Sequence, residues 1–139
     1  MLRDDAFHDR ITGNGAENQL AGGAGNDTID GGAGSDYLFG NAGQDRLRGG
    51  AGDDVLKGNA GGDVFVYDAA QSGHDVILDF TVGTDRLNVK AGLASAAALL
   101  AGTTADADGN AVLHLAADTS ITLIGVNPDE LTANAIQMI

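Results

Sequence analysis

The sequence has no cysteine and no tryptophan, and only 1 proline among its 139 residues. The lack of cysteine excludes a disulfide framework and any zinc site built on thiolates. Basic residues are also scarce: 7 Lys and Arg stand against 20 Asp and Glu, which gives a formal net charge of −13. A chain this acidic is a poor partner for nucleic acid, whose binding depends on basic side chains that displace counterions. The longest apolar run, near Leu93–Ala101, is too short to cross a bilayer, so no membrane span is predicted.

The residues that are abundant are glycine and aspartate. Glycine occurs 22 times, and the only acids that are not aspartate are Glu17 and Glu130. A chain with this composition and few aromatics repels itself and stays loose unless a partner neutralises it. Short carboxylates held close to glycine-rich backbone make cations the first candidate for that partner.

The glycines are concentrated in a repeat array. From Gly22 to Val66 the chain reads as five consecutive nonapeptides without insertion: GGAGNDTID, GGAGSDYLF, GNAGQDRLR, GGAGDDVLK and GNAGGDVFV. Positions one and four are always glycine. Position six is always aspartate, at Asp27, Asp36, Asp45, Asp54 and Asp63. Position eight is always large and apolar, at Ile29, Leu38, Leu47, Leu56 and Phe65. The same nine-residue phase continues towards the N-terminus over residues 1–21, but with fewer matching positions. We interpret these residues as degenerate N-terminal repeats that act as a cap.

Each unit predicts a turn followed by a very short strand. Three glycines within six residues exclude a helix, because glycine loses too much entropy there. The last three residues, for example Thr28–Asp30, form a strand whose middle side chain faces inwards. One buried side chain cannot offset the ordering entropy of nine residues, so the units must stack. Two units make an 18-residue turn, and successive turns lie about 4.8 Å apart as parallel strands.

Stacking at this period places the aspartates in two columns. Asp27, Asp45 and Asp63 share one column, extended by Asp9. Asp36 and Asp54 share the other, extended by Asn18. Carboxylates at strand spacing repel by about 1 kcal/mol per pair even at the dielectric of water. A cation between turns would meet only oxygen ligands, which favours Ca²⁺ over zinc or copper, whereas magnesium demands stricter octahedral order. A disordered linker would need no fixed spacing, and a metal-free solenoid would need a wider apolar ladder.

These residues resemble the RTX nonapeptide repeat, GGxGxDxUx, strongly over residues 22–66 and partly over residues 9–21. The resemblance implies a mainly β fold, a parallel β-roll, secreted by Gram-negative bacteria through type I secretion machinery. It also implies ions between loops one turn apart. The first loop gives the carbonyls of positions two and four and its aspartate. The second gives the carbonyls of positions one and three and its own aspartate.

Carried over to this sequence, the resemblance implies three Ca²⁺ sites. The first comprises Gly23, Gly25, Asp27, Gly40, Ala42 and Asp45. The second comprises Gly32, Gly34, Asp36, Gly49, Ala51 and Asp54. The third comprises Asn41, Gly43, Asp45, Gly58, Ala60 and Asp63, so Asp45 bridges two ions. A fourth site around Asn14, Ala16, Asn18, Gly31, Ala33 and Asp36 is weakened by the uncharged Asn18, and a fifth would pair Asp9 with Asp27.

Residues 67–139 are predicted to form a β-rich C-terminal cap with one short helix. Gly73–Phe80 and Gly83–Val89 resemble the segment that follows RTX arrays in serralysin-type proteases and alginate-epimerase R-modules, and they predict two more strands of the roll. A helix is expected over Ala94–Leu100. A hairpin is expected from Ala111–Ala116 and Ile121–Val126 around a turn at 117–120. A helical turn is expected at 128–130 and a final strand at Ala135–Ile139. In the family this region carries an uncleaved secretion signal.

The resemblance implies two candidate functions. The first is a calcium-binding module that folds after secretion as part of a larger exoprotein. The alternative is a polysaccharide-binding R-module of a secreted carbohydrate-modifying enzyme, with outward Arg46 and Arg48 touching an anionic sugar. No enzyme activity is predicted, because the sequence contains neither an HExxH motif nor a nucleophile elbow.

Several other residues were weighed for function. Tyr37, Phe39 and Val55 point outwards, and either the N-terminal segment or the cap covers them or they form a patch for a polysaccharide or a partner domain. Asp75 and Asp79 could be a general acid and base or metal ligands, but they are interpreted as turn and strand-edge acids. Residues 106–110 are interpreted as a polar turn rather than a calcium loop, because they lack the closing glutamate of an EF-hand.

Overall fold

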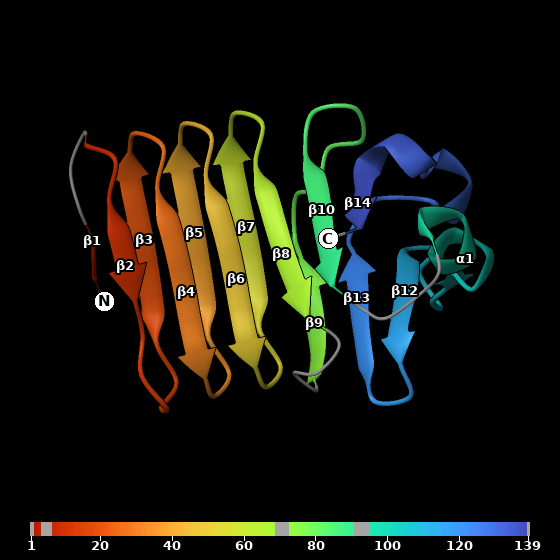
Figure 1. The fold of residues 1–139 in the computed structure, drawn as a ribbon, viewed down its shortest axis with the longest axis horizontal. Coiled ribbons are helices and arrows are strands. Elements are labelled where there is room, and N and C mark those ends of the chain that lie inside the picture. Colours follow the sequence, from red (N-terminus) through yellow and green to blue (C-terminus); the bar gives the residue numbers. More distant parts are fainter. Residues whose placement is uncertain (1, 4–6, 69–72, 91–94, 139) are drawn as a thin grey trace.

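The chain forms two sheets that face each other; the strands of the roll pair in parallel, and at one end the roll is continued by a cap in which the strands between residues 104 and 123 pair antiparallel with one another (Figure 1). The computed structural model describes residues 2–3, 7–68, 73–90 and 95–138. In these residues one sheet has the order β1 (Leu2–Arg3), β3 (Gln19–Ala24), β5 (Tyr37–Ala42), β7 (Val55–Ala60), β9 (Gly73–Ile77), β13 (Thr119–Leu123), β12 (Ala111–Ala116), β11 (Thr104–Ala105). The other has the order β14 (Ile136–Met138), β10 (Arg86–Lys90), β8 (Val64–Asp68), β6 (Arg46–Ala51), β4 (Thr28–Ala33), β2 (Arg10–Thr12).

The strand register confirms the 18-residue turn. Thr28 pairs with Arg46 and Tyr37 pairs with Val55, each 18 residues apart, and both pairings are parallel. Successive repeats alternate between the two sheets, as the parallel β-roll requires. The apolar residues at position eight, Ile29, Leu38, Leu47, Leu56 and Phe65, are all 0% exposed and fill the space between the sheets.

The strands are longer than the three residues predicted. β4 spans six residues, because Gly32 and Ala33 of the next repeat remain paired with Gly50 and Ala51. Gly32 adopts a positive φ of 97° without leaving the ladder. The glycine-rich stretch is therefore half strand and half turn.

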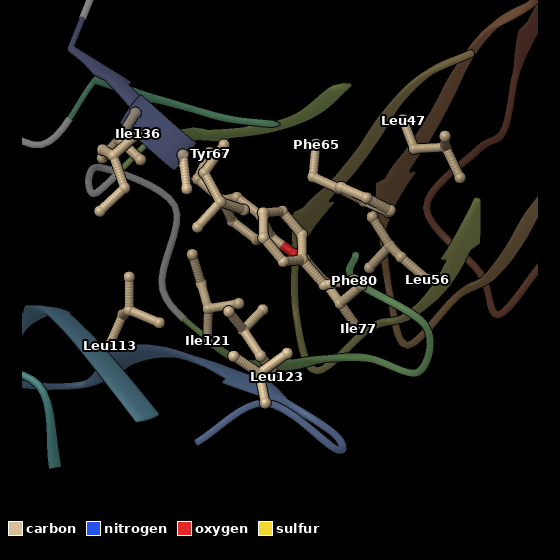
Figure 2. Packing of buried hydrophobic residues seen from close by; sticks show 14 of the residues in the cluster. Leu47, Leu56, Phe65, Tyr67, Ile77, Phe80, Leu113, Ile121, Leu123 and Ile136 are labelled. Carbon is tan, nitrogen blue, oxygen red and sulfur yellow. The ribbon is translucent and has the colours of Figure 1, made fainter. Parts of the chain in front are cut away.

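The C-terminal region adds the wide core that the narrow roll lacks. The segments expected after the array form β9 and β10, and both continue the roll in parallel. The buried cluster runs without a break from the position-eight residues to Ile77, Phe80, Leu113, Ile121, Leu123 and Ile136 (Figure 2). Phe65 and Phe80 join the two parts, with ring centroids 6.0 Å apart.

The remaining cap elements agree with the sequence expectations except in their bounds. The helix is α1 (Ala96–Ala101), capped by Ser95, whose Oγ accepts from the Ala98 N–H; Ala94 lies outside the described residues. The 3₁₀ turns are η1 (Pro128–Glu130) and η2 (Ala133–Ala135). The final strand is β14, and Ile139 lies outside the described residues.

The hairpin turn is shorter than the sequence predicts. Thr119 and Ser120 belong to β13, because they pair with Gly73 and His74 of β9 as well as with β12. The turn is thus confined to residues 117–118, and β13 ends at Leu123 rather than continuing to Val126. No helix in the described part of the chain has the length and apolar character needed to span a membrane.

Candidate metal centre

The aspartates at position six form two hydrogen-bonded columns, one along each edge of the roll. In the first column, Asp27 Oδ1 accepts from the Asp9 N–H, Asp45 Oδ1 from the Asp27 N–H and Asp63 Oδ1 from the Asp45 N–H, each at 2.9 Å. In the second, Asp36 Oδ1 accepts from the Asn18 N–H and Asp54 Oδ1 from the Asp36 N–H, each at 2.8 Å. One oxygen of every carboxylate therefore ties its turn to the turn before it.

The other oxygen of each repeat aspartate is buried without a partner. Within the described residues, no donor reaches Oδ2 of Asp27, Asp36, Asp45, Asp54 and Asp63. All five side chains are at most 1% exposed. A buried carboxylate oxygen with no hydrogen bond is costly, so these five atoms indicate a ligand that is itself a cation.

The electrostatics of the columns agree with this. Burial raises the pKa of Asp45 and Asp54 to about 6 and the pKa of Asp63 to about 7, against an ordinary value of 3.8. Neighbouring carboxylates in the same column raise these pKa values further, and the backbone N–H bonds lower them only in part. Burial also raises the pKa of Asp36. A divalent ion in the column would remove the penalty for ionisation.

The invariant glycines make room for these carboxylates and for backbone carbonyls. A Cβ on the first glycine of a repeat, such as Gly40, would collide with the carboxylate of Asp45 in the same repeat. A Cβ on Gly43, the glycine at position four of its repeat, would collide with the Gly25 carbonyl of the turn before. Gly43 also has a positive φ of 131°. The carbonyls expected to bind the ion thus lie directly against the next turn.

The structure brings the two loops of each implied site together. The register pairs Gly23 with Asn41, Gly32 with Gly50 and Asn41 with Asn59. These pairings place the loops of the first, second and third sites one turn apart. The carbonyls of Ala42 and Ala60 already accept from the N–H groups of Gly25 and Gly43, which leaves each of them one lone pair.

All donors in these loops are oxygens. Carboxylates and carbonyls at adaptable positions fit Ca²⁺, a hard cation that accepts 6–8 oxygen ligands. Within the described ranges, no three acidic or histidine side chains gather as a metal cluster. Each implied site instead combines two carboxylates with backbone carbonyls. These residues therefore fit a calcium ion that is coordinated by two successive loops together.

The degenerate N-terminal repeat is closed by its own side chains. Asn18 Oδ1 accepts from the Asn14 N–H at 2.8 Å, and Asn18 Nδ2 donates to Asn14 Oδ1 at 3.1 Å and to the Glu17 carbonyl at 3.2 Å. Asn18 Oδ1 lies against Gly13 as Asp27 Oδ2 lies against Gly22, but it is uncharged and already accepts from the Asn14 N–H. For the site that would pair Asp9 with Asp27, the bond from the Asp9 N–H continues the column.

Two functional candidates escaped the sequence reasoning. Asp75 extends the second column, because its Oδ1 accepts from the Asp54 N–H at 2.8 Å. Asp85 extends the first, because its Oδ1 accepts from the Asp63 N–H at 2.9 Å. Asp75 lies in strand β9 and is a member of the second column. The separations of Asp75 and Asp85 from the preceding aspartates, 21 and 22 residues, hide them from a search at a period of 18.

Residues 106–110 form a polar turn held by its own hydrogen bonds. Asp106 accepts from the N–H groups of Asp108 and Asn110 and from Asn110 Nδ2. The bonds from Asn110 lower the pKa of Asp106. The turn thus satisfies its own carboxylate.

Tyr37 is not covered by the termini, since 48% of its surface is exposed, whereas Phe39 and Val55 are half-buried.

The histidines remain separate from the columns' carboxylates. His74 Nδ1 lies 2.8 Å from Ser120 Oγ, and His114 Nε2 lies 2.9 Å from Thr104 Oγ1.

Comparison with known proteins points to the same chemistry. The family model of the RTX calcium-binding nonapeptide repeat matches residues 3–38, 12–47 and 39–77. No curated protein matches the chain in sequence.

Solved structures share the fold. The AlgE6R3 subunit of the Azotobacter vinelandii mannuronan C5-epimerase is 32% identical, with a TM-score of 0.70 over 87% of this chain and 77% of that one. The AlgE6R2 subunit of the same epimerase is 29% identical, with a TM-score of 0.61 over 99% and 91%. The extracellular lipase LipA from Serratia marcescens is 16% identical, with a TM-score of 0.55 over 96% of this chain and 38% of the lipase.

Proposed function

Because the chain belongs to the RTX calcium-binding repeat family, we propose that it is a secreted module whose folding depends on calcium bound between successive turns. The module has no catalytic role of its own and serves as the folding and secretion element of a larger exoprotein. Three ions occupy the loop pairs that start at Gly22 and Gly40, at Gly31 and Gly49, and at Gly40 and Gly58.

The observation that carries this proposal is the set of five buried Oδ2 atoms without a partner in the described residues. Each lies in a column of like charges that no Lys or Arg of the array enters, because Arg46, Arg48 and Lys57 lie on the strands. A calcium ion supplies two positive charges to each loop pair. Three ions reduce the net charge from −13 to −7.

The function follows from the affinity expected of such sites. Extracellular calcium modules have Kd values on the order of 10⁻⁴–10⁻³ M. The cytosolic calcium concentration is far below this range. The chain therefore stays unfolded in the cytosol and passes through the type I secretion machinery as an unfolded polypeptide. Outside the cell, calcium binds the folded state and not the unfolded one, and so stabilises it.

A calcium titration followed by circular dichroism tests the proposal. We expect the spectrum to change from disordered to β-rich with calcium and to revert with EDTA. Asp45→Ala is expected to raise the calcium midpoint most, because two ions lose a ligand. Asn18→Ala is the matched control, since its loop is closed by hydrogen bonds. Equal midpoints for the two variants, or a parent chain that stays folded in EDTA, would contradict the proposal.

A second candidate, binding of an anionic polysaccharide, is favoured by the charge on one face of the roll. The outward side chains of the sheet containing β6 include five of the seven basic residues: Arg10, Arg46, Arg48, Arg86 and Lys90. The acids on the described part of this face are Asp30 and Asp68, and Asp30 forms an ion pair with Arg48 at 3.1 Å. Because the chain as a whole is strongly acidic, a face with excess positive charge indicates a binding surface for an anionic ligand.

The arrangement of the arginines suits a polymer. Arg10, Thr28, Arg46, Val64 and Arg86 lie in one cross-strand row. The arginines therefore repeat every second strand, about 9.6 Å apart. A hollow of about 180 Å³ lies over this face, and its lining includes Arg10, Thr28, Arg46 and Arg48. Guanidinium groups bind carboxylates with two parallel hydrogen bonds, so a uronate chain such as mannuronan fits the row.

Calorimetry with mannuronan oligomers in calcium distinguishes this second candidate. The combined Arg46→Ala and Arg48→Ala variant should bind about tenfold more weakly, a loss of about 1.4 kcal/mol. Lys57→Ala, on the opposite sheet, should bind as the parent does. No measurable binding by the parent would remove this candidate and leave the calcium proposal intact.

A further inference from the structure

The second aspartate column continues past the repeats into the cap. Gly73, with a φ of 148°, lies so close to the Gly52 carbonyl that a Cβ would collide with it. The same close approach joins Gly43 to the Gly25 carbonyl inside the array. The His74 N–H donates to Asp53 Oδ1 at 2.8 Å, as the Gln44 N–H donates to Asn26 Oδ1. The start of β9, Gly73–Asp75, thus reproduces the contacts of positions four to six of a nonapeptide, although no nonapeptide is present.

Asp75 occupies the ligand position of that turn. Its side chain is 6% exposed, and the Asp54 N–H is the donor that the described residues provide to it. Asp54 in turn has a buried Oδ2 with no partner among the described residues. Two buried carboxylates therefore adjoin with no positive charge between them.

A third buried polar group without a partner comes from β8. Tyr67 extends from β8 into the core and is 5% exposed. No acceptor among the described residues takes its hydroxyl proton, and its oxygen, red in Figure 2, lies inside the apolar cluster. Burial raises the pKa of Tyr67, and the charges of Asp75 and Asp54 raise it further. An unmade hydrogen bond of this kind costs about 1–3 kcal/mol unless a ligand or its water completes it.

The first column ends differently at the same level. Asp85 Oδ1 accepts from the Asp63 N–H, and its Oδ2 accepts from the Thr81 N–H at 2.8 Å. Asp79 likewise uses both oxygens, on the N–H groups of Gly58 and Asn59. Protein donors therefore occupy both oxygens of Asp85 and of Asp79, whereas the donor that the described residues give to Asp75 reaches only its Oδ1.

We propose that an additional calcium ion binds between the loop ending at Asp54 and the start of β9 at Gly73–Asp75. The carboxylates of Asp54 and Asp75 and the Gly52 carbonyl hold it. The column that ends at Asp85 takes no ion at that level. This site lies outside the repeat motif and ties the cap to the roll. The inference rests on the proposed calcium sites of the array.

Native mass spectrometry of the calcium-loaded chain tests the proposal. Asp75→Asn keeps the acceptor for the Asp54 N–H but removes the charge, so we expect one fewer ion per chain than in the parent. Asp85→Asn, at the same position of the other column, is the matched control and should leave the count unchanged. An unchanged count in Asp75→Asn would overturn the proposal, and a lost ion in Asp85→Asn would overturn the assignment of no ion to the column that ends at Asp85.

A second measurement needs no variant. Anomalous diffraction from crystals of the unmodified chain soaked in Tb³⁺, a calcium substitute, locates every ion directly. A peak between Gly52 and Asp75 supports the proposal, and peaks confined to the array overturn it. A complete lack of peaks in the array as well would instead contradict the calcium function from which the inference proceeds.

Discussion

Each position-six aspartate shares its space with the first glycine of its own repeat. At Gly40 a Cβ would lie 2.9 Å from the Asp45 Cγ, and similar clashes occur at Gly22, Gly49 and Gly58. The glycine is therefore required by volume and not by an unusual φ. This explains why the first position never varies in the array, whereas the second alternates between Gly and Asn. Asn41 and Asn59 tolerate their positive φ of 73° and 66° there.

A methyl group at the first position should displace the carboxylate from its ligand position. We expect Gly40→Ala to destabilise the calcium-loaded chain by about 1–3 kcal/mol, the usual cost of overpacking. The calcium midpoint should rise in parallel. Gly15→Ala is the matched control, because a Cβ there meets nothing within 4 Å. Thermal unfolding of both variants in calcium measures the difference, and equal melting temperatures would show that the carboxylate does not need this space.

The aspartate column is the element that links one turn of the roll to the next. Its backbone bonds hold the carboxylates in line, while burial opposes their ionisation. Asp45 and Asp54 have a pKa of about 6 in the folded chain, and Asp63 and Asp75 have a pKa of about 7. These values exceed the 3.8 of an ordinary aspartate, so the metal-free folded state holds more protons than the unfolded state between these limits.

This difference fixes the direction of the pH dependence. For raised carboxyl pKa values the free energy of unfolding falls as pH rises, so the metal-free chain should be more stable near pH 5 than near pH 8. With saturating calcium the carboxylates stay ionised, and the loss of stability towards pH 8 should disappear. Circular dichroism of the metal-stripped and the calcium-loaded chain at both pH values checks this, because the metal-free chain should show more β structure near pH 5 than near pH 8. Greater stability of the metal-free chain near pH 8 would contradict the raised pKa values.

The same elements show what the sequence can predict. The strict period of nine determines the turn length, the register and the inward face of every repeat, because one shift would expose Leu47 and its equivalents. The columns follow from the same count. Asp75 and Asp85 were not predicted as column members, because the chain between the columns lengthens to 21 and 22 residues. The hydrogen bond from the Thr81 N–H to Asp85 Oδ2 forms within a loop, and no residue pattern in the sequence predicts it.

At the scale of the whole molecule, the roll is a stack in which each turn contacts only its neighbours. Such arrays gain stability from the interfaces between units, and their ends need capping. Here the cap supplies a large apolar cluster at one end, joined to the last repeat through Phe65 and Phe80. The rest of the array buries a single large side chain per repeat. The ions therefore carry more of the stability in the array than in the cap.

Removal of the ions should consequently expand the array first. A compact chain of this length has a radius of gyration near 14 Å, and a fully unfolded one near 39 Å, so these values roughly bracket the experiment. We expect small-angle X-ray scattering to give a radius slightly above the compact value in calcium, because the stack is elongated (Figure 1). In EDTA the radius should lie well above the loaded value but below the unfolded one, since the cap retains its apolar cluster. Magnesium at the same concentration should restore little of the compaction, because its strict octahedral shell suits these loops poorly. An unchanged radius in EDTA would mean that packing alone holds the turns together.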